Sequence, residues 1–183
     1  MKSPMAKVKS GHQEIIGETL AKLWLFEQGW DPYDRFLDRY KVDFVLRTQK
    51  ASAPVYRDIQ VKFRSLHPPC KWMKPMFSVH TGIRLGKDDF KDHRPELFVV
   101  VVLRTKSQPY QTDYFTFPSK WFRERIQEAP FYKKNVSKIV SFAKAATADN
   151  WFILKQRKKF LQVNVETCLN IDSYRNNAAL LGQ

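Results

Sequence analysis

The sequence has few cysteines, few acids for its number of bases, and no long hydrophobic run. Cys70 and Cys168 are its two cysteines, too few for a disulfide scaffold or a cysteine zinc cluster, so we expect reduced thiols. The longest apolar run, from Leu97 to Leu103, is the size of a strand and much shorter than the roughly 20 residues of a membrane helix. We therefore expect no membrane-spanning helix.

The start of the chain lacks the features of an export signal. Its first residues, MKSPMAKVKSG, are basic but contain no apolar stretch. No acid precedes Glu14, which leaves an organellar transit peptide as the less favoured interpretation. The chain also has no internal repeat, no Walker-type phosphate loop and no serine nucleophile elbow. We expect a cytoplasmic or nucleoid-associated protein that is not driven by ATP.

What the sequence has in excess is positive charge. Lysine and arginine total 32 against 18 aspartates and glutamates, which gives a formal net charge of +14. Hydrophobic residues make up 43% and aromatic residues 14%, enough for a folded core, so a disordered basic tail is excluded. A folded body this basic repels itself, and a polyanionic partner is the natural explanation. Charge alone does not separate nucleic acid from an anionic membrane surface. A membrane-surface protein has no need of the group of carboxylates described below, so we expect no membrane partner.

Local patterns predict an α/β protein with one domain over residues 1–183. The second half of its first helix has few polar positions and contains apolar residues such as Leu23 and Phe26. We therefore expect this helix to pack on more than one side. The expected helices and strands would place a central mixed sheet between flanking helices. The expected elements are a helix at 11–28 ended by Gly29, a connection at 30–39, strands at 41–47, 56–65, 77–81, 97–104 and 113–117, a helix at 120–127 capped by Ser119, one or two helices within 135–146, and a hairpin within 151–166.

Five polar residues of the first helix and the next two strands form a candidate site. Glu14 and Glu18 are four residues apart and share one helix face. Asp43 lies in the middle of the first strand, between two apolar residues. Gln60 and Lys62 are two apart on the next strand and point to the same side. If the two strands pair as a hairpin, Asp43 lies beside Gln60 and Lys62.

Each of these residues taken singly has an ordinary structural explanation, such as a solvated helix face or a half-exposed strand. Their combination matches the needs of phosphodiester cleavage, in which a divalent cation screens the phosphate and activates water. A hard cation such as Mg²⁺ takes oxygen ligands, which Asp43, Gln60 and Glu18 can supply. Lys62 can orient or help deprotonate the nucleophile and stabilise charge on the phosphorane.

The order of these residues resembles the PD-(D/E)xK nuclease superfamily, which has the restriction-endonuclease-like fold with an αβββαβ core. The resemblance rests on IGETLAKLWLFEQGW, KVDFVL and YRDIQVKFRS and covers about residues 11–127. The segment Gln60-Val61-Lys62 is similar to the Gln-x-Lys branch found among intron homing endonucleases and related bacterial nuclease domains. The family's usual proline before the strand aspartate is replaced by Val42.

The resemblance implies a role for each residue of the site. Asp43, Gln60 and the backbone carbonyl of Val61 correspond to metal ligands. Lys62 corresponds to the catalytic lysine, and Glu18, preferred over Glu14, to the helix acid. The implied activity is a Mg²⁺-dependent endonuclease, with Mn²⁺ as a substitute, that hydrolyses double-stranded DNA and works as a homo-oligomer.

Two other functions stay open from the sequence. Gln60 is neutral and holds Mg²⁺ less tightly than a carboxylate, so a catalytically inactive nucleic-acid-binding module of the same fold is one alternative. A structural or ribosome-associated basic RNA-binding protein is the other. A zinc site built from His67, Cys70, His80 and His93 is disfavoured, because their spacing matches no common zinc motif.

Basic residues concentrate late in the chain, with aromatic residues interleaved. We expect residues 128–183 to form a basic helical extension of the domain that holds the phosphate backbone. The candidate nucleic-acid-binding residues are Arg64, Lys71, Lys74, Arg84, Lys120, Arg123, Lys155, Arg157, Lys158 and Lys159.

Overall fold

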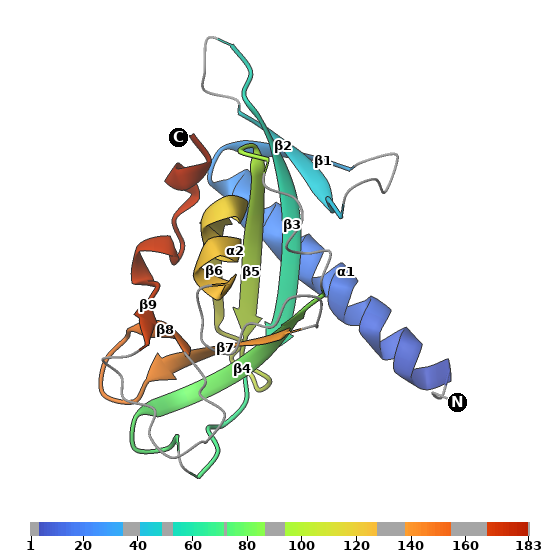
Figure 1. Ribbon diagram of the computed structural model, residues 1–183. Coiled ribbons are helices and arrows are strands. Elements are labelled where there is room, and N and C mark those ends of the chain that lie inside the picture. Colours follow the sequence, from blue (N-terminus) through green and yellow to red (C-terminus); the bar gives the residue numbers. More distant parts are fainter. Residues whose placement is uncertain are drawn as a thin grey trace.

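The computed structural model describes residues 4–34, 41–48, 53–71, 73–86, 94–127, 138–154 and 168–182. These residues form a mixed α/β protein with two α-helices and two β-sheets (Figure 1). The larger sheet has the order β1-β2-β3-β5-β6, with β1 (Trp30–Asp34), β2 (Phe44–Thr48), β3 (Tyr56–Ser65), β5 (Leu97–Arg104) and β6 (Thr112–Pro118). The smaller sheet has the order β4-β7-β8-β9, with β4 (Phe77–Leu85), β7 (Lys138–Ala145), β8 (Trp151–Leu154) and β9 (Leu169–Asn170).

The expected α/β class is confirmed, and the central sheet is mixed as predicted. β3 pairs with β5 in parallel, whereas β1, β2 and β3 form an antiparallel meander. The expectation of one sheet is wrong, because β4 and β7 cross the lower ends of β3 and β5 as part of a second sheet (Figure 1). The described residues between β3 and β5 contain strand β4 and no helix, which departs from the expected αβββαβ order.

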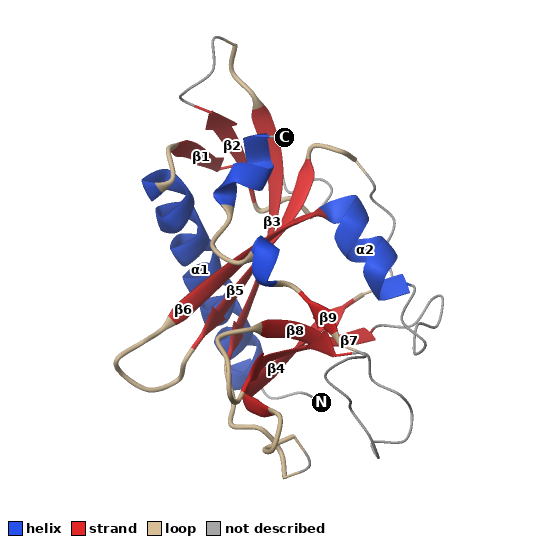
Figure 2. Cartoon of the chain, turned by 90° about the vertical axis from the view of Figure 1, so that its left-hand side faces the viewer, coloured by secondary structure: helices blue, strands red, loops and turns tan. Residues whose placement is uncertain are grey.

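Two apolar clusters hold the elements together on the two faces of the larger sheet. On one face, Ala21, Trp24 and Leu25 of helix α1 (Pro4–Glu27) pack against Phe44 of β2 and Ile59 of β3. Figure 2 shows α1 and the second helix, α2 (Ser119–Gln127), on opposite sides of this sheet.

The second cluster lies on the α2 side and joins the two sheets. Phe122 and Ile126 of α2 pack with Val99 of β5 and with Val140 and Phe142 of β7. The smaller sheet and α2 therefore cover the β5–β6 part of the larger sheet, and α2 lies chiefly against β5 and β6.

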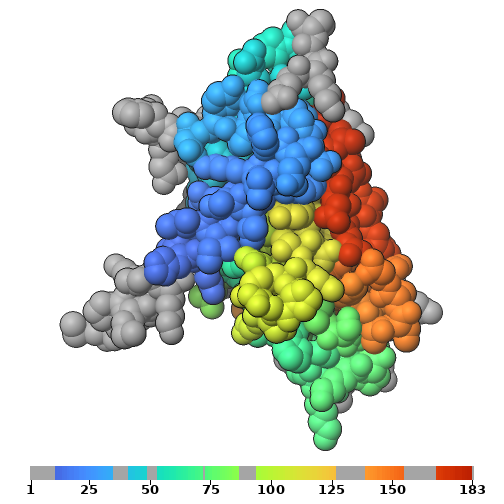
Figure 3. Space-filling model, turned by 180° about the vertical axis from the view of Figure 1, so that it is seen from behind, coloured from blue at the N-terminus to red at the C-terminus, as the bar shows by residue number. Residues whose placement is uncertain are grey.

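Helix α1 begins earlier than predicted, and it ends close to Gly29, the residue predicted to terminate it. Gly29 has a φ of 86°, a left-handed conformation that glycine adopts without strain. The expectation of packing on more than one side is wrong, because Leu23 and Phe26 are 56% and 57% exposed. Figure 3 shows the residues of α1, in blue, forming a ridge across this side of the molecule.

Three further local predictions differ from the structure. Residues expected to form a connection after Gly29 form the edge strand β1, and the helix expected within 135–146 is strand β7. Ser119 is the first residue of α2, and within the described part of the chain its buried hydroxyl has no hydrogen-bond partner, so it is not a side-chain cap. Of the hairpin expected within 151–166, the structure describes the strand β8, whose partners β7 and β9 lie outside that range; residues 155–167 lie outside the described residues.

The last described segment, residues 168–182, packs into both apolar clusters. Ile171 is buried in the cluster between the sheets, and Leu181 is buried in the α1 cluster. Between them Arg175 pairs with Asp113 of β6 at 2.6 Å and with Asp149 at 2.5 Å. Among the described residues, neither helix combines the length and the hydrophobicity that crossing a membrane requires.

Candidate active site

The meander brings Asp43 next to Gln60. Phe44 pairs with Ile59, and the backbone N–H of Asp43 donates to the carbonyl of Ile59 at 2.8 Å. Because the strands are antiparallel, the residue before Phe44 lies opposite the residue after Ile59. Asp43 therefore lies opposite Gln60, on the same face of the sheet. Asp43 was expected in the middle of its strand, but it directly precedes the first residue of β2. The predicted juxtaposition with Gln60 is present all the same.

After Gln60, β3 continues beyond the first residue of β2, so backbone groups on this edge of β3 are not paired with β2 and face Asp43. The backbone N–H of Val61 donates to Oδ2 of Asp43 at 2.5 Å. The N–H and C=O of one strand residue point to the same edge, so the carbonyl of Val61 also faces the Asp43 side. Asp43 Oδ1 and this carbonyl are two oxygen donors at the place where the strands diverge.

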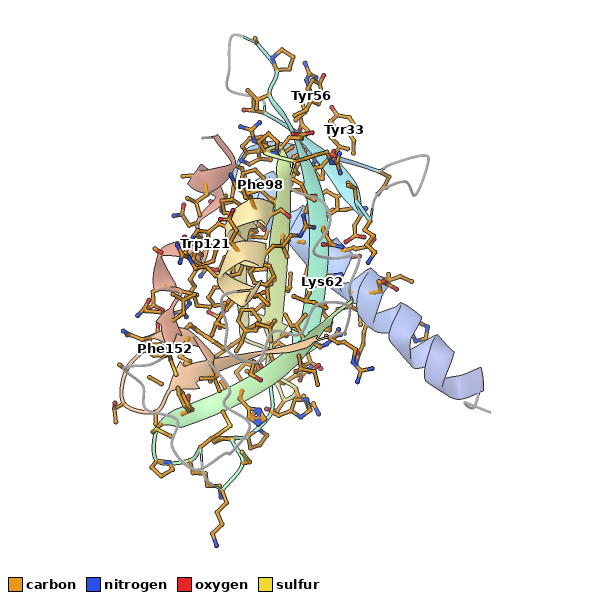
Figure 4. The ribbon with its side chains drawn as sticks, viewed as in Figure 1. Tyr33, Tyr56, Lys62, Phe98, Trp121 and Phe152 are labelled. Carbon is orange, nitrogen blue, oxygen red and sulfur yellow. The ribbon has the colours of Figure 1, made fainter. Side chains whose placement is uncertain are left out.

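A pocket of about 150 Å³ opens at this edge of β3. Its carboxylates, Glu14 and Glu18, come from α1, and Lys62 and Arg64 come from β3. Arg84 is contributed by β4 of the smaller sheet, so three elements supply the charged side chains. Figure 4 shows Lys62 on β3, beside α1. The helix acids and the strand lysine, far apart in sequence, thus share one cavity.

The carboxylates of this centre repel one another in a partly dry environment. The pKa of Asp43 is raised from 3.8 to about 6, chiefly by burial and also by the negative charges of Glu18 and Glu14, against the opposing effects of the Val61 amide and Lys62. The pKa of Glu18 is also raised, chiefly by burial, while Lys22 lowers it. Glu18 acts on Asp43 more strongly than Glu14 does, which agrees with the preference for Glu18 as the helix acid.

The raised pKa of Asp43 predicts that its charge costs stability. Because the folded state binds this proton more tightly than the unfolded state, stability contributed by protonation is lost as pH rises from about 4 through about 6. Asp43→Asn mimics the protonated form and keeps an acceptor for Val61. We expect it to raise the free energy of unfolding at neutral pH by up to about 3 kcal/mol. Urea unfolding at neutral pH and near pH 4 measures this.

Asp113→Asn is the matched control for this measurement. Asp113 is also nearly buried, but it is paired with Arg175, so the same substitution removes a favourable ion pair and should destabilise the protein. The gain from Asp43→Asn should disappear near pH 4, where native Asp43 is already protonated. If Asp43→Asn is instead less stable than the unaltered protein at neutral pH, the charge of Asp43 does not destabilise the folded state.

The basic residues expected to bind nucleic acid fall into three groups. Arg64 and Arg84 line the pocket beside Lys62. Exposed lysines away from the pocket lining are Lys71, Lys74 and Lys120. The cluster Lys155, Arg157, Lys158 and Lys159 lies outside the described residues, as does most of the predicted basic extension.

Arg123 is the one candidate that the structure contradicts. Its side chain is 3% exposed, because α2 turns it inward next to the buried Phe122. A nucleic acid cannot reach it, so Arg123 is removed from the nucleic-acid-binding set. The predicted basic helix of the late chain is also wrong in its described part, where β7 and β8 stand instead.

The histidines of the disfavoured zinc set are partly brought together. His67 and His80 form an isolated β-bridge, with ring centroids 6.5 Å apart. Burial lowers the pKa of both rings, and Lys106 lowers that of His67 further. His93 lies outside the described residues. Within the described ranges, no three or more histidine, cysteine, aspartate or glutamate side chains form a group that could hold a metal ion.

The donors around Asp43 are of a different kind. They are one carboxylate, the strand-edge carbonyl of Val61, the amide of Gln60 and, from α1, Glu18. All are oxygen donors, which hydrated Mg²⁺ accepts while keeping several of its waters. The crowding of negative charge that raises the pKa of Asp43 is what a bound cation would relieve. The residues present therefore fit a hydrated Mg²⁺.

Four residues of potential use were missed from the sequence. Gln13 lines the pocket one turn before Gly17. Tyr33, Arg47 and Tyr56 are exposed on the outer face of the larger sheet. Alternation along β2 and β3 was the available signal for Arg47 and Tyr56, which fall in phase with Asp43 and Gln60. Tyr33 had no such signal, because β1 was not predicted.

Comparisons with protein-family models, with curated proteins and with solved structures find no match to this chain.

Proposed function

We propose that the chain is a metal-dependent endonuclease that hydrolyses DNA phosphodiester bonds, with the restriction-endonuclease-like fold as its framework. The observation that carries the proposal is the convergence of Asp43, Gln60 and Lys62 at the diverging edge of β2 and β3, with Glu18 in the adjoining pocket. The net charge of +14 around this small acidic centre supports a polyanionic substrate.

Each residue has a task set by its position. Asp43, the Val61 carbonyl and Gln60 would hold Mg²⁺, with Glu18 binding it directly or through water. When bound, this ion lowers the pKa of the attacking water and screens the phosphate. Lys62 orients the water and stabilises the charge that develops on the phosphorane.

The pocket arginines extend the site toward the substrate. Arg64 on β3 and Arg84 on β4 approach the cavity from two sheets, and each presents a planar group suited to phosphate oxygens. They position the phosphates that flank the scissile one. The preference for double-stranded DNA, the homo-oligomeric state and the Mn²⁺ substitution rest on the family resemblance alone.

The test is cleavage of supercoiled plasmid, single-stranded DNA and RNA with Mg²⁺ or Mn²⁺. Nicking or linearisation that requires the metal and stops with EDTA supports the proposal. If none of these substrates is cut with either metal, the enzyme proposal fails. The Lys62→Ala variant in the same assay excludes a contaminating nuclease.

The second candidate is a binding module without activity. It is favoured by Gln60, a neutral ligand that is 4% exposed and offers Mg²⁺ no charge. In that case DNA binding persists without cleavage and weakens steeply as salt is added, because phosphate contacts release counterions.

A further inference from the structure

The outer face of the larger sheet carries an exposed group of two tyrosines and an arginine. Tyr33 of β1 and Tyr56 of β3 are 48% and 55% exposed, and Arg47 of β2 lies between their strands. Arg47 pairs directly with Tyr56 in the register and hydrogen-bonds to Tyr33, which raises its pKa. Asp31 lies opposite Arg47 on β1. We name Tyr33, Arg47 and Tyr56 the tyrosine patch.

The tyrosine patch shares its face with the candidate active site. Phe44 and Leu46 of β2 face α1, so the alternate residues Asp43 and Arg47 point to the opposite side. The same alternation on β3 puts Tyr56 in phase with Gln60 and Lys62. Figure 4 shows Tyr33 and Tyr56 together at one end of the meander and Lys62 farther along β3.

Strand geometry gives the separation between patch and site. Arg47 is four positions after Asp43, which directly precedes β2, and Gln60 is four positions after Tyr56 on β3. At the rise of a strand this is about 13 Å, or about four nucleotides at the B-form rise of 3.4 Å. A strand held at Asp43 therefore reaches the tyrosine patch within a few nucleotides of the cut.

We infer that the tyrosine patch stacks unpaired bases of the substrate strand. Half-exposed tyrosine rings on a sheet face cannot reach bases inside a duplex, but they suit splayed bases of a single strand. Arg47, fixed by Tyr33, adds a cation for the backbone. The inference rests on the proposed nuclease function and names its substrate: DNA with unpaired nucleotides next to the cut, either single-stranded or at a junction.

The experiment measures binding of a fluorescein-labelled oligothymidylate, its fully abasic counterpart and a blunt duplex by fluorescence anisotropy, in EDTA so that no cleavage interferes. We expect Tyr33→Ala and Tyr56→Ala each to weaken binding of the oligothymidylate about tenfold. Binding of the abasic strand and of the duplex should change less than about twofold. Tyr33→Phe and Tyr56→Phe keep the ring and should retain binding.

Tyr110→Ala is the matched control. Tyr110 is 49% exposed and lies 3.9 Å from the guanidinium of Arg104, but it stands between β5 and β6, away from the meander. It should bind all three probes as the unaltered protein does. Circular dichroism and thermal melting exclude misfolding of the alanine variants.

Three outcomes overturn the inference. One is unchanged binding in both alanine variants, and another is an equal loss for the abasic strand, which would mean backbone contact alone. The third is that the alanine variants lose self-association of the protein but bind the probes normally. The patch would then be an interface with another copy of the chain. Failure of the nuclease proposal looks different: no substrate is cut, yet the tyrosine variants still bind bases less well.

Discussion

Replacing Lys62 with alanine is expected to lower the rate of DNA cleavage by about 10³-fold while DNA binding falls by less than about tenfold. Lys62 lies on β3 two residues after Gln60 and lines the pocket with Glu14 and Glu18. Its charge lowers the pKa of Asp43, so under the proposed function its ammonium would act on both the attacking water and the charge that develops on the phosphate. Phosphate binding has further cations in Arg64 and Arg84, so affinity depends on Lys62 much less than chemistry does.

The measurement is single-turnover cleavage of plasmid with protein in excess and saturating Mg²⁺, so that the rate reports the chemical step. Lys106→Ala is the control, because Lys106 is an exposed lysine next to His67 on the loop after β5 and lines no part of the pocket. Its rate should match that of the unaltered protein. Cleavage by Lys62→Ala within about threefold of the normal rate would contradict the role given to Lys62.

The parts of the site that could be predicted from sequence are those fixed by local alternation. β3 has the predicted bounds Tyr56–Ser65, because apolar and polar residues alternate strictly along it. β5 also has its predicted bounds, Leu97–Arg104, since a run of β-branched residues buried on both faces has few other solutions. Once β2 and β3 pair, the position of Asp43 beside Gln60 follows from register alone.

The parts that could not be predicted are those fixed by distant partners. β7 contains alanine and lysine, which favour helix, but its pairing with β4 more than fifty residues earlier makes it a strand. β1 contains Pro32 and two aspartates, which disfavour strands, and it is tolerated as the edge strand of the sheet. Arg84 enters the pocket only because the second sheet crosses β3, a topology with no local signal.

The exposure of single helix residues could not be predicted from the sequence. Arg123 is charged yet buried, because α2 must direct Phe122 and Ile126 into the core and Arg123 follows Phe122 on that side. Leu23 and Phe26 are apolar yet exposed, because α1 meets the sheet along one face only. In both cases the helix orientation is set by the partner surface, which the helix sequence does not contain.

Gly17 is the residue on which the geometry of the pocket depends most. A Cβ at this position would lie 2.3 Å from the Cβ of Phe63 and 3.5 Å from its Cα. The backbones of α1 and β3 therefore approach each other at Gly17 more closely than any side chain would permit. This approach helps to bring Glu18, the next residue of α1, into the same pocket as Lys62, the residue before Phe63.

Gly17→Ala is expected to destabilise the protein by about 2 kcal/mol and to lower cleavage by about 10²-fold. The added methyl group overlaps a strand side chain at its root, where no rotamer change relieves the contact, so α1 must shift away from β3. Alanine is otherwise about 1 kcal/mol better than glycine inside a helix, so a net loss of stability measures the clash. Urea unfolding and single-turnover cleavage give the two quantities.

Gly11→Ala provides the control on the same helix. No atom lies within 4 Å of a Cβ at Gly11, so the substitution should stabilise the protein by up to about 1 kcal/mol and leave cleavage unchanged. If Gly17→Ala behaves in the same way, α1 does not hold its glutamate against β3 by close contact. If instead stability falls but the cleavage rate stays normal, Glu18 is dispensable for catalysis, and Asp43, Gln60 and Val61 suffice to hold the metal.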